Sequence, residues 1–187
     1  TIIKLDSEMD HGPILVQETE NIRPDDDRVT LRKRLLKRGA KLLLEVLPKY
    51  INGELTPSEQ NHSTASYVTL FKKDHGFIPP KYIATALQVF DPESSNRGGV
   101  APQAHWEIPF IKNYSLVPSP YSLDRFIRAV NPWPGAWTLL RQDFGGQAKR
   151  LKILKAHLET KAIDVNTIRL VLDKVQLEGK NPVSWEQ

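Results

Sequence analysis

The apolar positions of the first 53 residues predict a strand pair followed by one long helix. Short aliphatic runs at Ile2-Ile3 and 14–16 lie on either side of Gly12-Pro13, a dipeptide typical of turns. Aspartates at 25–27 can then cap a helix whose apolar residues recur at helical spacing. These residues are Leu31, Leu35, Gly39, Leu42, Val46 and Tyr50. Because two strands and one helix cannot enclose a core, we expect the last piece of an α/β sheet, and hence a fragment of a longer protein.

The last third of the chain predicts one helix and then a series of short strands. Ser119-Pro120 places an N-cap residue before a proline at the first helical position, and the prolines after Asn131 end the helix. Beyond Trp137 we expect a small β-barrel or sheet with a hairpin turn at Gly145-Gly146. The expected strands are 137–141, 149–158, 167–172 and 174–178, and residues 181–186 have the pattern of a helix start.

The residues between these two blocks carry a weaker pattern. Residues 54–80 are polar and turn-rich, which predicts a linker. A short helix is expected at about 80–90, at the start of a proline-rich stretch that we interpret as an insertion or extended loop. The predicted segments are therefore 1–53, 54–80, 81–118 and 119–187.

Composition excludes several kinds of site. The chain of 187 residues has no cysteine, so disulfides, thiol nucleophiles and thiolate metal sites are excluded. Its five histidines show no metal-ligand spacing, and we expect no metal. No apolar run approaches the roughly 18 residues that span a bilayer, and the first residues lack the pattern of a secretion signal. We therefore expect no membrane partner, a cytoplasmic location and a monomer.

The net charge of +4 comes entirely from the last third. Residues 120–187 hold 11 Lys and Arg against 7 Asp and Glu, whereas the two groups balance in the rest of the chain. A basic module suggests an anionic partner, with nucleic acid as the first candidate, and a solvated lysine-rich surface as the alternative. For the basic face of the long N-terminal helix, a solvated surface is the favoured interpretation. That face carries Arg32, Lys33, Arg34, Lys37, Arg38 and Lys41.

Several basic residues of the last third are placed for contact with phosphate. Arg125 and Arg128 fall on the predicted helix face away from the apolar residues, which leaves them free. Lys149, Arg150 and Lys152 lie on one predicted strand, where neighbouring residues point to opposite faces, so only part of the group can form one patch. The tryptophans of the run from Asn131 to Trp137 are expected to pack the corner between helix and strand.

The acidic loop before Gly12 is the candidate for chemistry. Asp10 lies between two apolar strands, which are expected to half-bury its carboxylate. The loop also carries Asp6 and Glu8, which is more acid than a turn requires. The alternative is that Asp10 serves only the backbone of the turn. His11 is expected to point away from Asp10 as a solvated or turn histidine.

Together and in this order, three blocks of the sequence resemble methionyl-tRNA formyltransferases. The run Leu5-Asp6-Ser7-Glu8-Met9-Asp10-His11-Gly12-Pro13-Ile14-Leu15 resembles the folate-loop motif of 10-formyltetrahydrofolate-dependent transferases, with its D-x-G-x-x-L core. Residues 64–73 are similar to the linker that joins the two domains of the family. Residues 122–137 resemble the R-A-x-N-P-W-P-x-x-W signature that opens the C-terminal domain, and this third block is the specific one.

The resemblance implies a fold and a reaction. Residues 1–53 would end a Rossmann-like formyltransferase domain, and residues 119–187 would form a small OB-like β-barrel that binds tRNA and is truncated at its end. The reaction implied is transfer of a formyl group from 10-formyltetrahydrofolate to the amino group of methionyl initiator tRNA, in translation initiation. Asp10 matches the family's catalytic aspartate. In the family, this aspartate orients a histidine that acts together with an asparagine on the formyl group.

The resemblance also assigns the two kinds of binding residue. The folate loop matches Leu5, Asp6, Ser7, Glu8 and Met9. The residues expected to contact tRNA are Lys72, Lys73, Arg125, Arg128, Lys149, Arg150 and Lys152.

The sequence departs from the family in one important way. The catalytic asparagine and histidine and the Ser-Leu-Leu-Pro folate segment are absent from the 187 residues, so we expect this polypeptide to be inactive alone. Two other readings stay open. One is a tRNA-binding module without catalysis, and the other is a different 10-formyltetrahydrofolate-dependent enzyme, such as one acting on a sugar amine.

Overall fold

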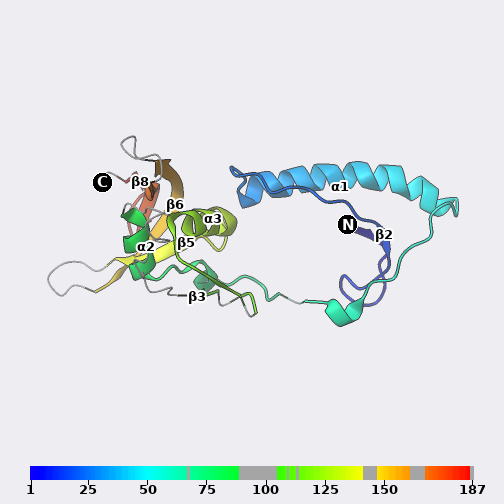
Figure 1. Ribbon diagram of the computed structural model, residues 1–187, viewed down its shortest axis with the longest axis horizontal. Helices are drawn as coiled ribbons and strands as arrows, with labels where there is room; N and C mark the ends of the chain where they lie inside the picture. Colours follow the sequence, from blue (N-terminus) through cyan, green and yellow to red (C-terminus); the bar gives the residue numbers. More distant parts are fainter. Residues whose placement is uncertain are drawn as a thin grey trace. The chain divides into compact units, whose positions relative to one another are not determined.

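The computed structural model describes residues 1–66, 68–88, 105–108, 110–112, 114–140, 147–160 and 167–185. The chain divides into two compact units, Thr1–Tyr67 and Val68–Gln187, which are treated separately below (Figure 1). No helix in the described ranges combines the length and the apolar composition that are needed to cross a membrane.

The first unit begins with the predicted strand pair. Strands β1 (Ile2–Ile3) and β2 (Ile14–Val16) are antiparallel, and Ser58 continues this pairing through two backbone hydrogen bonds with Ile14, of 2.7 and 2.8 Å. Gly12 lies against the end of β1, where a Cβ atom would meet the carbonyl oxygen of Lys4 at 1.8 Å. Only glycine therefore fits at this point of the turn.

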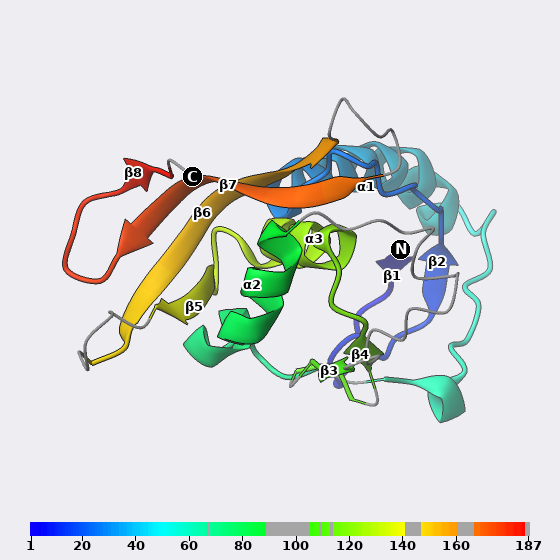
Figure 2. The ribbon, with the colours of Figure 1, turned by 60° about the vertical axis from the view of Figure 1, so that its left-hand side comes forward.

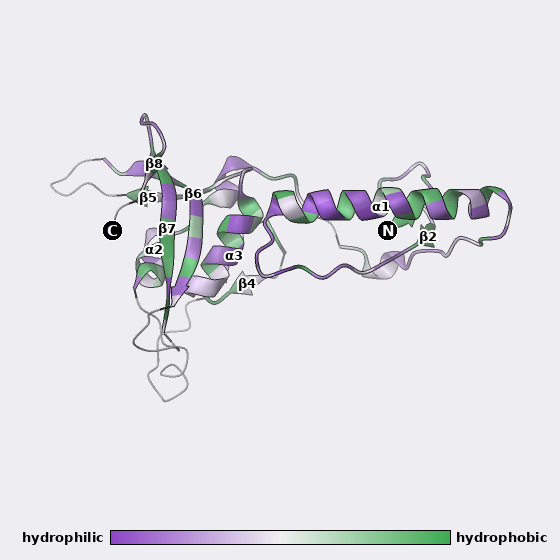
Figure 3. Cartoon of the chain, turned by 90° about the horizontal axis from the view of Figure 1, so that it is seen from above, coloured by the Kyte–Doolittle hydropathy of each residue, from purple (hydrophilic) through white to green (hydrophobic). Residues whose placement is uncertain are grey.

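The long helix α1 (Arg28–Ile51) confirms the predicted helix, but its apolar stripe is buried only in part. Asp27 caps it, since its carboxylate accepts a 2.8 Å hydrogen bond from the backbone N–H of Thr30. Within the described residues the helix buries only Leu42 and Val46, and Leu35 of the predicted stripe is 45% exposed. Figure 3 shows apolar bands that continue along the helix beyond these two residues.

Two arginines on the basic face of α1 are neutralised by carboxylates. Arg34 bonds to Asp26 at 2.5 and 2.7 Å and to Glu20 at 3.0 Å. Arg38 bonds to Glu18 at 2.8 Å and to Glu20 at 2.5 Å. The Arg34 guanidinium holds the pKa of Asp26 well below its ordinary value. These pairs tie residues 18–26 to the helix, so this part of the face has a structural role.

The second unit is built on a four-stranded antiparallel sheet in the order β5-β6-β7-β8. Its strands are β5 (Ala136–Leu140), β6 (Lys149–Thr160), β7 (Ile168–Leu177) and β8 (Val183–Ser184). Helices α2 (Pro80–Leu87) and α3 (Pro120–Val130) pack against the sheet (Figure 2). Ser119 caps α3 and Pro120 is its first residue, as predicted.

The core of this unit lies between the helices and one face of the sheet. Apolar residues alternate along β6, where Leu151 and Ile153 are buried, and β7 adds Leu170 and Leu172. They pack against the apolar face of α3, formed by Leu123, Phe126, Ile127 and Val130.

The closed OB-like barrel predicted for residues 119–187 is not confirmed. In the described residues the sheet is open, with β5 and β8 as its edges. Strand β8 has only two residues, which are too few to close a barrel, and helices rather than further strands cover the apolar face. The Rossmann-like part is not confirmed either, since the described residues of the first unit contribute only β1, β2 and α1 to such a fold.

Three smaller expectations for the sheet can also be compared with the structure. The strands predicted at 167–172 and 174–178 form the single strand β7. The helix start predicted at 181–186 is wrong, because Val183 and Ser184 pair with β7 and extend the sheet. The turn predicted at Gly145-Gly146 lies outside the described residues, although the strands on either side are antiparallel neighbours.

The described residues at both ends of the predicted 81–118 insertion contribute to the core. The short helix expected at about 80–90 is α2, which buries Tyr82, Ile83 and Ala86. Strands β3 (Trp106–Glu107) and β4 (Ser115–Leu116) form an antiparallel pair, and Trp106 packs against Phe126 with ring centroids 4.7 Å apart.

The end of the predicted linker is fixed to strand β5. The short 3₁₀ helix η2 (Lys73–Gly76) places Gly76 where a Cβ atom would lie 1.8 Å from the carbonyl oxygen of Gly135. The N–H of Ile78 donates to the carbonyl of Trp137 at 2.8 Å, and the Trp137 indole donates to the carbonyl of Lys73 at 3.0 Å. These contacts hold Lys73 beside the sheet.

Candidate functional sites

Asp10 lies on the exposed surface of the first unit, so the expectation that its carboxylate is half-buried is wrong. Its backbone adopts a left-handed conformation with φ of 54°, which aspartate tolerates better than most residues. The side chain of Gln60 holds this turn by donating to the carbonyls of Asp10 (3.0 Å) and Gly12 (2.6 Å). Within the described residues the Asp10 carboxylate has no hydrogen bond or ion pair. The two-stranded β1–β2 pair is too small to cover the loop.

A different carboxylate of the same loop binds a histidine. Oδ2 of Asp6 lies 2.7 Å from Nδ1 of His11, and the other oxygen accepts from the backbone N–H of Glu8 at 2.9 Å. The hydrogen bond to His11 lowers the pKa of Asp6, and the same bond raises the pKa of His11. The His11 ring also stacks on His62, with centroids 3.8 Å apart and planes 8° apart.

Sequence reasoning missed this Asp6–His11–His62 group. His11 turns to Asp6 rather than to Asp10, in agreement with the expectation that the side chains of Asp10 and His11 point apart. The contact with His62, which is in the 3₁₀ helix η1 (His62–Thr64), joins residues far apart in sequence and has no local signal. In the part of the chain that the structure describes, no three His, Asp or Glu side chains are grouped as a metal site requires.

The folate-loop residues predicted from the resemblance share this exposed loop. Leu5 and Met9 are 79% and 88% exposed, and Asp6 holds the loop through His11 and Glu8. Their large exposed apolar surface is available to a ligand or to another protein segment.

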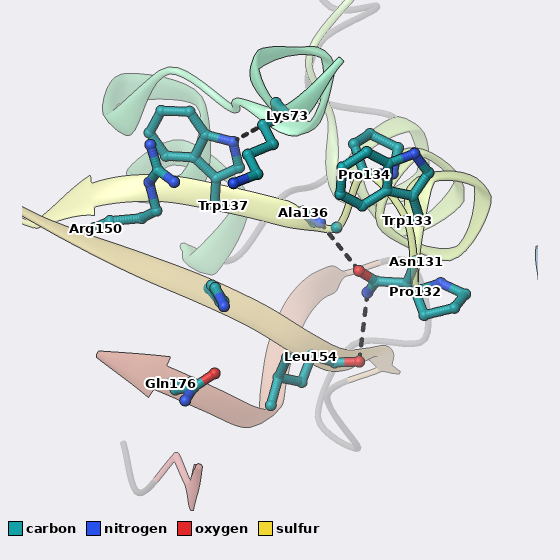
Figure 4. A pocket seen from close by; sticks show the side chains of 12 residues that line it. Lys73, Asn131, Pro132, Trp133, Pro134, Ala136, Trp137, Arg150, Leu154 and Gln176 are labelled. Carbon is teal, nitrogen blue, oxygen red and sulfur yellow. Dashed lines mark hydrogen bonds between the residues drawn. The ribbon is translucent and has the colours of Figure 1, made fainter. Parts of the chain in front are cut away.

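The second unit carries a different site on the sheet face opposite its core. The register of the strands places Trp137, Lys152 and Gln176 side by side on β5, β6 and β7. Arg150 lies on the same face as Lys152, two residues earlier, and its guanidinium covers the Trp137 ring at 4.1 Å (Figure 4). The alternation that buries Leu151 and Ile153 thus directs the basic side chains to this face.

The loop before β5 completes a hollow of about 360 Å³ at this face. Asn131 fixes the loop, since its amide donates to the carbonyls of Ile153 (3.0 Å) and Leu154 (3.3 Å) and accepts from the N–H of Ala136 (3.0 Å). Figure 4 shows Trp133 and Pro134 on one side of the hollow and Arg150 with Trp137 on the other. The lining residues are Lys73, Asn131, Pro132, Trp133, Pro134, Gly135, Ala136, Trp137, Arg150, Lys152, Leu154 and Gln176.

The structure brings together only three of the seven residues predicted to contact tRNA. Lys73, Arg150 and Lys152 line the hollow. Lys72 is exposed immediately before Lys73, whereas Lys149 points to the other face of the sheet, as the strand alternation predicted.

The two arginines of α3 are separate from this hollow. Helix α3 covers the core face of the sheet, and Arg125 is exposed there. Arg128 was expected to be free for phosphate, but its Nε donates to the buried Asp124 carboxylate at 3.0 Å. That expectation is therefore wrong for Arg128.

The two tryptophans of the loop differ in a way that the sequence did not indicate. Trp137 packs the corner as expected, against Phe77 with centroids 4.7 Å apart and beneath Arg150. Trp133 is 47% exposed, so it does not serve the corner alone. An exposed indole that lines the same hollow as several cations is a signal that only the three-dimensional arrangement provides.

Comparison with known proteins identifies related sequences. Residues 119–168 match the family described as formyl transferase, C-terminal domain. Methionyl-tRNA formyltransferase from Chloroflexus aurantiacus is 33% identical over 156 residues, which cover 83% of this chain and 37% of the relative. The Dictyoglomus thermophilum protein of the same name is 30% identical over 191 residues, which cover 99% of this chain and 48% of the relative. The Roseiflexus castenholzii protein of the same name is 28% identical over 200 residues, which cover 98% of this chain and 50% of the relative.

The chain thus spans half or less of the length of these curated relatives. The matches extend over both units, and the family match begins at Ser119, the N-cap of α3.

Proposed function

Since the chain belongs to the formyl transferase family, we propose that it is part of a methionyl-tRNA formyltransferase. In that enzyme a formyl group would pass from 10-formyltetrahydrofolate to the amino group of methionyl initiator tRNA. The observation that carries the proposal is the similarity to methionyl-tRNA formyltransferases over nearly the whole chain, including both the Asp10 loop and the Trp133 loop.

The second unit has the role of binding tRNA. Its sheet face carries Arg150 and Lys152, with Lys73 beside them, and its hollow has no carboxylate among the lining residues. A cationic face with aromatic side chains suits the phosphates and bases of a nucleic acid. The residues proposed to contact tRNA are those of the hollow first, with Lys72, Lys149 and Arg125 as more distant contacts.

The first unit has the role of supplying Asp10 and the folate loop to the transfer site. An aspartate that orients a catalytic histidine needs that histidine within hydrogen-bond distance. Among the described residues Asp10 has no such partner, and His11 is bonded to Asp6 instead. Residues 1–187 alone are therefore expected to give no formylation, while the loop residues 5–9 remain the proposed contacts for the folate.

Binding of tRNA to the chain tests the proposal. Methionyl initiator tRNA and a sugar nucleotide are each titrated against residues 1–187 at several salt concentrations. Affinity for tRNA should fall steeply as salt rises, because phosphate contacts release counterions. Binding that is weak and independent of salt would refute the tRNA role, and tight binding of the sugar nucleotide instead would favour the sugar-amine reading.

Catalysis is tested separately with the same polypeptide. Residues 1–187 are incubated with 10-formyltetrahydrofolate and methionyl-tRNA, and formyl-methionine is measured after hydrolysis of the tRNA. No product above the reaction without protein is expected. Turnover by this polypeptide would show that residues within it take the place of the family's catalytic asparagine and histidine.

A further inference from the structure

The hollow beside β5 combines an exposed indole with cations and has no carboxylate among its lining residues. We propose that it holds a single unpaired nucleotide of an RNA strand, with the base against Trp133 and the phosphate near Lys73 and Lys152. The inference rests on the proposed function, since it specifies which part of an RNA the second unit takes. It adds a defined site to what would otherwise be a general basic surface.

Several groups in the hollow are already used to hold the fold. The Asn131 amide is bonded on both sides, to Ile153, Leu154 and Ala136. The Trp137 indole donates its N–H to Lys73 and has Arg150 over its ring. A base therefore has no access to the Arg150-covered face of Trp137. The aromatic surface that a ligand can reach belongs to Trp133, which is 47% exposed.

The cations of the hollow are placed to bind an anion. Lys73 and Lys152 are both exposed, and in the described part of the chain neither has an ion pair. The acid that lines the adjoining hollow is Glu178, which accepts a hydrogen bond from the backbone N–H of Arg150 at 3.2 Å. A phosphate between Lys73 and Lys152 would meet two positive charges that have no ion pair in the described residues, while the guanidinium over Trp137 adds a third positive group.

The size of the hollow favours one nucleotide over a stretch of helix. Its volume of about 360 Å³ is at the lower end of the sites that enclose small ligands. A base inside a duplex has both faces covered by its neighbours, so it cannot stack on a side chain. An unpaired base can do so, and every base offers a face, which makes such a site tolerant of sequence.

The test compares unpaired with paired RNA on the intact 187-residue chain. A labelled short single-stranded RNA and a duplex of the same charge are titrated by fluorescence anisotropy against the wild type and Trp133→Ala. Loss of the indole should weaken single-strand binding about tenfold, since stacking of one base contributes that much. Duplex binding, which depends on phosphates, should change by less than about twofold.

Two further variants separate stacking from folding. Trp133→Phe keeps an aromatic face and should bind the single strand within about threefold of wild type. Tyr121→Ala removes a similarly exposed aromatic residue, 43% exposed on α3 and outside the hollow, and should leave both affinities unchanged. Circular dichroism of each variant checks that the unit is folded.

The possible outcomes separate this inference from the proposed function. If Trp133→Ala weakens neither RNA while both still bind, the nucleotide site is refuted and the tRNA role stands. If it weakens both equally, the hollow is only part of a general surface and the inference also fails. If 5-formyltetrahydrofolate displaces the single strand from the wild type, the hollow is a folate site instead. Absence of binding to either RNA would refute the tRNA role and the nucleotide site together.

Discussion

Each of the two units of the chain is stabilised internally by a different kind of interaction. The second unit surrounds a continuous cluster of buried apolar residues that runs from Ile78 on the linker side to Val175 on β7. In the described residues of the first unit, the apolar residues that are buried are Leu42 and Val46. That unit relies instead on Gln60, on the Asp27 cap and on the ion pairs of α1.

This difference has a consequence for function. Burial of one large apolar side chain stabilises a fold by about 1.5–3 kcal/mol and is insensitive to pH, whereas exposed ion pairs contribute less and depend on both pH and salt. The site of the second unit is therefore carried by a rigid sheet. The Asp10 loop of the first unit is held in part by a contact that responds to the charge state of Asp6 and His11, and residues 18–26 are held to α1 by contacts that respond to the charge state of Asp26.

The largest expected effect comes from removing a core side chain of the second unit. Leu123 is fully buried between α3 and the sheet, so Leu123→Ala should lower the free energy of unfolding by about 2–5 kcal/mol. All four tryptophans, at 106, 133, 137 and 185, belong to this unit. Their fluorescence during denaturant unfolding therefore reports on the second unit alone.

Leu42→Ala is the matched control in the first unit. Leu42 is 8% exposed, and its removal should leave the midpoint of the tryptophan transition unchanged while it weakens the helical signal of α1. An equal shift of the tryptophan midpoint by both variants would show that the two units unfold as one.

The next effect concerns the ion pairs of α1. Asp26→Asn removes the carboxylate that receives two hydrogen bonds from Arg34 and one from the N–H of Arg23. The pKa of Asp26 is held below its ordinary value of 3.8, so the charged form stabilises the folded unit at pH above about 4, and this contribution is lost as the pH falls further. The variant should be less stable than the wild type at neutral pH. Its stability should also fall less than that of the wild type as the pH is lowered, as followed by circular dichroism.

Glu45→Gln provides the control for this prediction. Glu45 pairs with Lys41 across 3.8 Å, and both side chains are well exposed. Loss of this carboxylate should change the free energy of unfolding, followed through the helical circular dichroism signal, by less than about 0.5 kcal/mol at any pH. If Asp26→Asn behaves like Glu45→Gln, then the Arg34 pairs do not hold residues 18–26 to the helix, and the contrast between the two units is weaker than the geometry indicates.

The sequence predicted the elements better than it predicted their partners. Local signals specified α1 through Asp27, α3 through Ser119 and Pro120, and the alternation along β6. Closure of the sheet could not be predicted, because it depends on which elements cover the apolar face, and that is decided by α2 and α3. The helix start expected at 181–186 failed for a similar reason, since pairing of Val183 with Val175 outweighs local propensity.

The candidate sites show the same limit. The role of Asp10 that the motif implies stays a prediction, whereas the strand alternation correctly separated Lys149 from Arg150 and Lys152. The ion pair of Arg128 with Asp124 has the i,i+4 spacing of neighbours on one helix face and could have been predicted, whereas the exposure of Trp133 follows from no local spacing. Likewise, His62 reaches His11 through a tertiary contact that no local pattern contains.

The smallest expected effect sharpens the comparison at the acidic loop. The hydrogen bond from Asp6 raises the pKa of His11 above its ordinary value of 6.5. Protonated His11 therefore stabilises the folded loop fully below about pH 6.5, and this contribution is lost as the pH rises through the raised pKa. Asp6→Asn should move the pKa of His11 down, as measured by NMR titration of its imidazole, with His11→Gln used to assign the signal. Glu8→Gln should move the pKa of His11 less, because Glu8 acts on His11 only through its charge. An equal or larger shift would mean that the Asp6 hydrogen bond is not the main cause of the raised pKa of His11.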